Sequence, residues 1–304
     1  MNASLVLAGA LALDALLGEP KWLWNRLPHP AVLMGRLIGW CDRRFNRGKA
    51  RRAKGLAVLL ALIAFGVVLG LLLARLGAVA EICVAAVLLA QKSLVQHVGA
   101  VAQGLRMSLQ AGRDAVAMIV SRDTGQMEES AVARSAIESA AENLSDGVIA
   151  PAFWFVLAGL PGLLVYKLVN TADSMIGYRT VRYEAFGWAA ARTDDVLNLL
   201  PARGTAALIA IVSGLRIDAK LRSDARLHRS PNAGWPEAAM ASALGIALSG
   251  PRAYDGEMRE FAWVNAGGRR HPTPVDIDDS IAVLWRVWSI VLLASAAIGL
   301  MLEF

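Results

Sequence analysis

The sequence predicts an all-α integral membrane protein that crosses the bilayer about four to six times. Of its 304 residues, 56% are hydrophobic and only 18% are charged, whereas roughly 25% of residues are charged in an average soluble domain. Two long runs, 55–79 and 281–304, contain one and two charged residues respectively. A helix needs about 20 mostly apolar residues to cross the hydrocarbon core, so each run is long enough.

Six apolar stretches define the expected membrane segments: residues 3–18, 55–76, 78–95, 147–169, 199–215 and 281–303. The first contains Asp14 and has no basic region before it, which favours a retained membrane segment over a cleaved signal peptide. No polar loop separates the second from the third, so we expect a hairpin around Leu76-Gly77.

The fourth stretch is interrupted by Leu160-Pro161-Gly162. Proline removes a backbone donor and clashes with the preceding turn, and glycine loosens the helix. Two outcomes fit this pattern: one kinked span, or two half-helices that re-enter the same face of the membrane. The fifth stretch is short, so the sequence does not decide whether it crosses the bilayer, and about four to six crossings are expected.

A basic run precedes the second stretch. Between Arg36 and Lys54, eight basic residues accompany the single acid Asp42. Nucleic-acid binding is the alternative, but the run directly adjoins an apolar span and fits the excess of Lys and Arg in cytoplasmic loops. We therefore expect residues 36–54 to face the cytoplasm, and the hairpin then returns residues 97–146 to the same side.

Two polar regions interrupt the apolar pattern within what we expect to be one membrane domain, 1–304. Residues 97–146 show apolar positions three or four apart and many helix-forming residues, so they are predicted to be helical. Residues 216–280 contain several prolines and a Gly267-Gly268 pair, so they are predicted to be rich in loops. Both regions are placed at the cytoplasmic face.

The first polar cluster contains Glu138, Glu142 and Asp146, spaced i, i+4, i+8. On a helix these residues lie on one face, where three like charges repel one another. A magnesium ion or a substrate amine would explain the arrangement, because hard cations prefer carboxylate oxygens. A solvated acidic face is the alternative, and the proximity of Asp146 to the fourth apolar stretch favours function.

The second cluster follows the broken stretch. Lys167, Asn170 and Ser174 share a helical face, with Asp173 beside them. An ionisable residue at the end of an apolar span is costly unless it is paired or hydrated, so it is a functional candidate. The alternative is a lysine that extends to the membrane interface.

The third cluster is centred on Asp194, Asp195 and Asn198, with Arg192 before it and Arg203 after it. Adjacent aspartates and an asparagine oxygen could bind magnesium. The alternative is helix capping, since aspartate is a preferred N-cap residue, although capping explains only one of the two.

Other common sites are disfavoured. Cys41 and Cys83 lie in unrelated contexts, and no two histidines have metal-binding spacing, so a disulfide framework or a zinc site is not expected. The sequence contains neither a Walker-type phosphate loop nor a G-x-S-x-G nucleophile elbow.

The ordered motifs of this chain resemble those of the CobD/CbiB family over nearly its whole length. They comprise Leu13-Asp14, Gly18-Glu19-Pro20, residues 29–38, Val120-Ser121-Arg122-Asp123-Thr124, residues 138–147, Ala150-Pro151, Tyr166-Lys167, residues 170–177, Ala191-Arg192, residues 194–198, Pro201-Ala202-Arg203 and residues 230–240. Beyond Ile281 the likeness is one of hydrophobicity alone.

The resemblance implies an inner-membrane enzyme of adenosylcobalamin synthesis, with its active site facing the cytoplasm. Such an enzyme joins the propionate carboxyl of adenosylcobyric acid to (R)-1-amino-2-propanol or its O-phosphate, and ATP with Mg²⁺ is the expected energy source. The implied partners are these substrates, the lipid bilayer and other cobalamin-synthesis enzymes, and not nucleic acid.

The chemistry of amide synthesis suggests residue roles. Candidate catalytic residues are Glu138, Glu142, Asp146, Lys167, Asp173, Arg192 and Arg203. Candidate substrate-binding residues are Arg122, Asp123, Asn143, Asn170, Ser174 and Asn232. Candidate magnesium ligands are Asp194, Asp195 and Asn198, and we expect the three clusters to converge in one pocket.

Two other functional classes stay open at this point. A transporter would also use broken helices and polar groups near the membrane, although no inverted repeat is visible. A signalling protein like AmpE, from a neighbouring family, would show no turnover of cobyric acid.

Overall fold

The computed structural model describes residues 1–254 and 257–303, and almost all of its regular structure is helical. Four helical stretches are long and apolar enough to cross a membrane: Arg51–Ala74, Ala78–Met107, Glu129–Ile176 and Pro274–Met301. The pair Trp188–Leu197 and Leu199–Val212 makes a fifth if the two count as one span, and Ala3–Leu17 is a shorter apolar helix. The chain is therefore an all-α polytopic membrane protein, as predicted.

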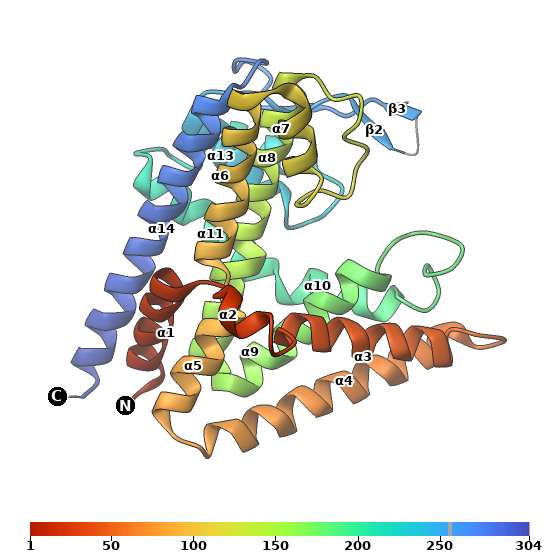
Figure 1. Cartoon of the computed structure of the whole chain (residues 1–304), viewed down its shortest axis with the longest axis vertical. Helices are drawn as coiled ribbons and strands as arrows, with labels where there is room; N and C mark the ends of the chain where they lie inside the picture. Colours follow the sequence, from red (N-terminus) through yellow and green to blue (C-terminus); the bar gives the residue numbers. More distant parts are fainter. Residues whose placement is uncertain (255–256, 304) are drawn as a thin grey trace. The chain divides into compact units, whose positions relative to one another are not determined.

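The elements follow one another along the chain as coloured in Figure 1. The helices are α1 (Ala3–Leu17), α2 (Lys21–Trp24), α3 (Pro30–Phe45), α4 (Arg51–Ala74), α5 (Ala78–Leu88), α6 (Gln91–Met107), α7 (Leu109–Val116), α8 (Glu129–Leu144), the π-helix η1 (Ser145–Ile149), α9 (Ala150–Ile176), α10 (Trp188–Leu197), α11 (Leu199–Val212), α12 (Ala219–Ala225), α13 (Gly234–Leu244) and α14 (Pro274–Met301). The strands are β1 (Leu248–Ser249), β2 (Arg252–Tyr254), β3 (Glu257–Arg259) and β4 (Trp263–Val264).

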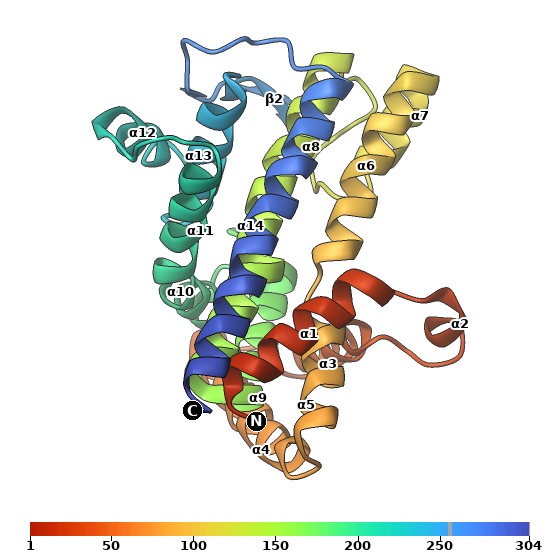
Figure 2. The same cartoon turned by 90° about the vertical axis from the view of Figure 1, so that its left-hand side faces the viewer.

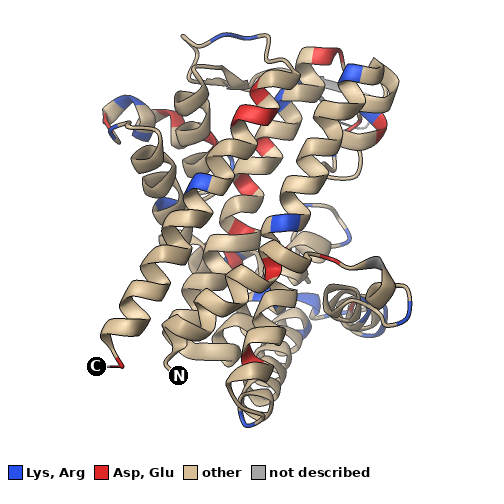
Figure 3. Ribbon diagram, turned by 60° about the vertical axis from the view of Figure 1, so that its left-hand side comes forward, with Lys and Arg blue, Asp and Glu red and all other residues tan. Residues whose placement is uncertain are grey.

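The chain divides into two compact units, each assembled from segments far apart in sequence. Unit 1 comprises residues 1–90, 150–199 and 292–304, and unit 2 comprises residues 91–149 and 200–291. Figure 3 shows long stretches of the helices without any charged residue, as expected for segments that contact lipid.

In unit 1, α4 packs closely against α9 through glycines. A Cβ on Gly70 would lie 2.5 Å from the Pro161 backbone, and one on Gly66 would lie 3.0 Å from the Leu168 side chain. Small residues let helices in a membrane approach closely enough for dense van der Waals contact. The turn before α5 contains Gly77 with a φ of 90°, which confirms the predicted hairpin.

The interruption predicted in the fourth apolar stretch lies at Ala158 and Gly159, just before Pro161. Gly159 has φ 59° and ψ −153°, and the helical conformation is lost at both residues. A Cβ on Gly162 would lie 2.4 Å from the Trp154 carbonyl oxygen, although residues eight apart on a straight helix are separated by about 12 Å. The helix is therefore sharply bent at this break, as predicted, and the choice between one kinked span and two re-entrant half-helices stays a prediction.

The two termini of the chain lie together in unit 1 (Figure 1). The Asn2 side-chain amide donates to the Gly299 carbonyl at 2.7 Å, and the terminal amine is 3.8 Å from Glu303. The N-terminal helix α1 packs on α5, where Gly9 contacts Ile82.

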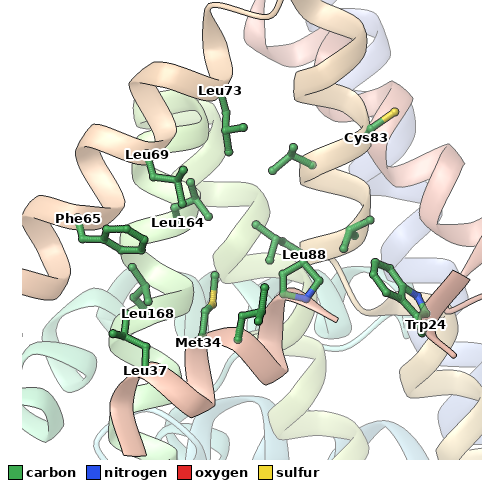
Figure 4. A pocket seen from close by; sticks show the side chains of 14 residues that line it. Trp24, Met34, Leu37, Phe65, Leu69, Leu73, Cys83, Leu88, Leu164 and Leu168 are labelled. Atoms are coloured by element: carbon green, nitrogen blue, oxygen red, sulfur yellow. The ribbon is translucent and has the colours of Figure 1, made fainter. Parts of the chain in front are cut away.

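An apolar groove in unit 1 is formed by α3, α4, α5 and α9 (Figure 4). It encloses about 570 Å³, and its walls are almost wholly aliphatic and aromatic, among them Phe65, Leu69 and Leu164. No charged side chain lines it among the described residues. It has the character of a lipid-facing or apolar ligand surface rather than a site of polar chemistry.

In unit 2, α6 and α7 form a helical hairpin beside α8 (Figure 2). The region 216–280, predicted to be rich in loops, also contains α12, α13 and two short antiparallel strand pairs, β1–β4 and β2–β3. Asn265, with a φ of 51°, organises part of this region because its side-chain amide donates to the carbonyls of Ala241 and Ile246. Local side-chain to backbone bonds of this kind were not visible in the sequence pattern.

Candidate active site

A polar cavity of about 250 Å³ lies in unit 2 between the segment after α7, helix α8 and the beginning of α13. Its lining residues come from positions more than 100 residues apart in the sequence: Ile119, Val120, Ser121, Arg122, Ser139, Glu142, Asn143, His228, Glu237 and Arg252. Three of them, Arg122, Glu142 and Asn143, are among the predicted site residues.

Glu138 forms the charged centre beside this cavity. Its carboxylate accepts from Arg122 at 2.8 Å and from Arg252 at 3.3 Å, and it accepts the Ser249 backbone N–H at 2.6 Å. Only 1% of the Glu138 side chain is exposed, against 13% for Arg122 and 10% for Arg252. A buried charge is tolerated when it is paired and hydrogen-bonded, so Glu138 holds the two guanidinium groups in place.

The turn after β1 is shaped to reach Glu138. Ser249 and Gly250 both have positive φ, 65° and 73°, and a Cβ on Gly250 would lie 2.6 Å from the Trp263 ring. A side chain at Gly250 would therefore be strained in backbone and blocked in space. The Ser249 hydroxyl also accepts from Arg252 at 2.9 Å, so both Ser249 and Glu138 hold this arginine.

Glu237 and His228 form the opposite wall. Burial, reinforced by repulsion from Glu138 and Glu142, raises the pKa of Glu237 well above its ordinary value. Burial and the nearby Arg252 lower the pKa of His228. Both pKa shifts favour the neutral form of the group, which weakens any ion pair between His228 Nε2 and Glu237 Oε1 at their separation of 3.7 Å.

The backbone determines which nitrogen of His228 is protonated. The Ser230 backbone N–H donates to His228 Nδ1 at 3.0 Å, so the neutral imidazole carries its proton on Nε2, the nitrogen nearer Glu237. His228 is thus a donor toward Glu237 and not a base at that position. The other oxygen, Glu237 Oε2, is buried and has no hydrogen-bond partner within the described part of the chain.

The Ser230–Gly234 motif orients these two residues. The Ser230 hydroxyl accepts the backbone N–H groups of Asn232 and Ala233 and so begins the turn into α13. A Cβ on Gly234 would lie 2.1 Å from the Ala225 carbonyl oxygen, so only glycine allows α13 to start this close to α12.

The rest of the first cluster follows α8. Ser139 Oγ donates to the Ile119 carbonyl and accepts from Asn143, which connects the cavity wall to the segment after α7. Glu142 lines the cavity, whereas Asp146 lies beyond the end of α8 in η1. The change from an α-helix to a π-helix interrupts the regular i, i+4, i+8 face predicted for the three carboxylates, and π-helical segments are frequent at functional sites.

The second and third clusters meet in unit 1 through a buried polar network between α9 and α10. Asn170 donates to Asp194 Oδ1 at 3.2 Å, Asn198 donates to Asp194 Oδ2 at 3.0 Å, and Tyr166 donates to Asn198 Oδ1 at 3.0 Å. These two clusters therefore converge as predicted. Their convergence with the first cluster stays a prediction.

Magnesium binding by the residues of this network stays a prediction. Both oxygens of Asp194 and the side-chain oxygen of Asn198 accept hydrogen bonds from neighbouring side chains. Asp195 lies 3.6 Å from Arg192 in a largely exposed pair. Among the described residues, no three His, Cys, Asp or Glu side chains gather as metal ligands. The hydrogen bonds connect α9 to α10 whether or not an ion binds there.

Other predicted residues take separate places. Arg203 stacks over Trp235 at 4.9 Å and donates to Asn232 at 3.4 Å within unit 2. Ser174 donates back to the Asn170 carbonyl on α9. The same helix carries Lys167 and Asp173, so these side chains belong to unit 1.

Sequence reasoning missed three residues of the cavity: His228, Glu237 and Arg252. Glu237 lies in the motif of residues 230–240, and the available signal was a carboxylate in the first turn of an apolar helix. Arg252 and His228 had no comparable pattern, because the turn of Ser249 and the imidazole contacts of Ser230 become visible only in three dimensions.

Comparison with known proteins gives a consistent result. The model of the family described as CobD/Cbib protein matches residues 7–284. A protein of Rhizobium meliloti named cobalamin biosynthesis protein CobD is 48% identical, with 97% of each chain covered. Proteins with the same name from Brucella anthropi and Rhodobacter capsulatus are 47% and 45% identical, with 98% and 94% of each chain covered. No solved structure matches. The chain belongs to the CobD/CbiB family.

Proposed function

We propose that this protein acts in cobalamin biosynthesis as an amide-forming ligase. It joins the propionate carboxyl of adenosylcobyric acid to (R)-1-amino-2-propanol or its O-phosphate, with ATP as the energy source. The names of the relatives support the pathway. The cavity in unit 2 supports the chemistry, because it offers carboxyl groups to an amine and guanidinium groups to anions.

The observation that carries the proposal is the buried Oε2 of Glu237, which has no hydrogen-bond partner among the described residues and lies in a polar cavity that Glu142 also lines. A buried polar atom without a partner costs free energy, so its retention calls for a ligand that satisfies it. An ammonium group is a suitable ligand, since it donates three hydrogen bonds and carries the complementary charge. A cavity of about 250 Å³ suits a small amine.

The proposed reaction has two steps. A carboxylate oxygen attacks the γ-phosphorus of ATP, the bond to ADP breaks, and an acyl phosphate forms. The bound ammonium group first passes a proton to a base, which frees the lone pair of the amine. The amine nitrogen then attacks the acyl carbon, phosphate leaves, and the leaving phosphate takes the second proton from the nitrogen. Glu237 is the proposed base, because a carboxylate with a raised pKa accepts a proton more readily near neutral pH.

The remaining cavity residues have complementary roles in this proposal. Glu142 binds the incoming ammonium group. Arg122 and Arg252, held by Glu138, stabilise negative charge as it develops on the acyl and phosphoryl oxygens. Mg²⁺ accompanies ATP, and no residue of the Asp194 network is assigned to it.

The proposed location is the inner membrane, with the cavity open to the cytoplasm, where ATP is available. The basic run between Arg36 and Lys54 supports this orientation. The proposal includes neighbouring cobalamin-synthesis enzymes as partners, since the corrinoid substrate comes from one enzyme and the product goes to another.

The test uses purified full-length protein with adenosylcobyric acid, ATP, Mg²⁺ and each amine in turn, with products followed by mass spectrometry. We expect an amide product with wild-type protein, and a loss of about 10²–10⁴-fold in rate for Glu237→Gln. The matched control is Glu260→Gln, an exposed glutamate that does not line the cavity. Absence of product with both amines, or uptake of cobyric acid into vesicles without conversion, would refute the ligase assignment.

A further inference from the structure

A second pocket of unit 2 lies beside the amine cavity and shares Arg122 and Arg252 with it. It encloses about 520 Å³, within the ~300–1,000 Å³ typical of small-molecule sites. Its walls come from the segment before α8, from α8 itself, from the turn after β1 and from the segment after β4. Four arginines line it: Arg122, Arg134, Arg252 and Arg270.

Arg134 is the most informative of the four. Only 8% of this residue is exposed, and no carboxylate lies within ion-pair distance of it in the described part of the chain. Its one described contact is with the ring of Trp263, 4.8 Å from the guanidinium carbon. Glu138 lies one turn further along α8, but its oxygens already accept from Arg122, Arg252 and the Ser249 backbone.

A buried guanidinium with no carboxylate within ion-pair distance is costly, because burial removes hydration and only the more distant charges of Glu138 and Glu128 offset the loss. Arg134 lines an open pocket, so a ligand can supply the missing anion. The planar guanidinium group presents its donors in a fork that matches the oxygens of phosphate. The chemistry of the ligand is therefore anionic and rich in oxygen acceptors.

The other charges of the pocket fit a ligand with several negative charges. Arg270 stacks on the same Trp263 ring at 5.1 Å, so one indole orders two guanidinium groups. Asp123 and Glu128 also line the pocket, and the Glu128 carboxylate accepts from Ser130 at 2.9 Å. Four guanidinium groups thus face two lining carboxylates, with Glu138 behind Arg122 and Arg252.

We propose that this pocket binds the phosphate chain of a nucleoside triphosphate, with Arg134 and Arg270 as its principal contacts. The identity of the nucleotide as ATP rests on the proposed ligase function. The shared Arg122–Arg252 wall then places the phosphates on one side and the amine cavity on the other. An acyl phosphate formed at this wall would lie next to the amine that attacks it.

A phosphorylated amine carries the same phosphate chemistry, so the experiment includes both sources. Equilibrium dialysis of detergent-purified protein, without corrinoid, measures binding of MgATP, inorganic tripolyphosphate and aminopropanol O-phosphate. The variants are Arg134→Gln and Arg270→Gln, and the matched control is Arg226→Gln, an exposed arginine of unit 2 outside the pocket. Arg270 is exposed, so its replacement leaves folding intact even if Arg134→Gln does not fold.

We expect MgATP and tripolyphosphate to bind saturably and more weakly at high salt. Loss of a charge-assisted contact should weaken both about tenfold or more in Arg134→Gln and about threefold to tenfold in Arg270→Gln, with no change in Arg226→Gln. Equal MgATP affinity in wild type and folded Arg270→Gln would overturn the proposal. So would weakened binding of aminopropanol O-phosphate alone, because the pocket would then hold the amine substrate. MgATP binding without amide synthesis would refute the ligase function and leave this site standing.

Discussion

Replacement of Glu138 by glutamine tests the charged centre of unit 2 most directly. The change keeps the shape of the side chain and an oxygen that can accept the Ser249 N–H, but it removes the charge that Arg122 and Arg252 share. Two guanidinium groups, 13% and 10% exposed, then lose the carboxylate that they share. Removal of one member of a buried pair typically costs about 3–5 kcal/mol. We expect Glu138→Gln to lose stability in this range.

The contrast is with an exposed ion pair of the same chain. Arg192 and Asp195 lie 3.6 Å apart with exposed fractions of 62% and 32%, so Asp195→Asn should cost less than about 1 kcal/mol. Thermal unfolding in detergent, followed by tryptophan fluorescence, compares the two variants under identical conditions. Equal melting temperatures for Glu138→Gln and Asp195→Asn would refute the assignment of Glu138 as the anchor of both arginines.

Three further predictions concern other parts of the chain. Glu237→Gln should have a higher melting temperature than wild type at neutral pH. Burial raises the pKa of Glu237 in the folded state, so the native protein retains a proton that the unfolded chain releases above about pH 4.5. The stability of the wild type therefore falls as pH rises above that value, whereas glutamine has no proton to lose. Melting curves of the two proteins should merge below pH 4.5, and parallel curves at all pH values would contradict this. Gly70→Ala should destabilise the folded protein by about 1–3 kcal/mol, because a Cβ at this position would lie 2.5 Å from the Pro161 backbone. Gly204→Ala is the control, since open space surrounds Gly204 and no loss of stability is expected. The melting temperatures of the two variants test this difference. A cysteine at Lys49 should be protected from an impermeant reagent in intact cells, and rapid labelling would exclude a cytoplasmic position for residues 36–54.

The membrane segments could be predicted from the sequence because the hydrocarbon core imposes one dominant requirement. A run such as 55–76 is apolar over the length that spans the bilayer, and it forms the greater part of α4. The hairpin at Gly77 followed from the missing polar loop. The break within α9 could be predicted, but its angle could not, since proline and glycine interrupt a helix without specifying the angle between its two parts.

The candidate site was only partly predictable, because residue type does not specify environment. The spacing of Glu138 and Glu142 placed both on one helix face, and both lie beside the cavity. The aspartates at positions 194 and 195 are predicted magnesium ligands, and the structure adds an amide donor to each oxygen of Asp194, which the sequence did not predict. One of these hydrogen bonds comes from a side chain of α9 that contacts α10, so the sequence of α10 alone could not predict it.

Three glutamates of unit 2 show how environment divides roles among chemically identical groups. Glu138 is surrounded by two arginines and a backbone N–H, so its charge is fully used in holding the wall. Glu142 lines the cavity on α8, where it can meet a cationic substrate. Glu237 is buried, near the other two, and its pKa is raised by both burial and their negative charge. Pairs of carboxyl groups whose environments separate their pKa values are a recurring basis for acid–base chemistry. The same environment makes the ionised form of Glu237 unfavourable in the folded protein. Glu237 is the group proposed to accept the amine proton, yet its replacement by glutamine should stabilise the fold. We therefore expect Glu237→Gln to lose synthesis and to gain melting temperature together. This combination is expected of a residue that is retained for function, because selection for stability alone would favour glutamine at position 237.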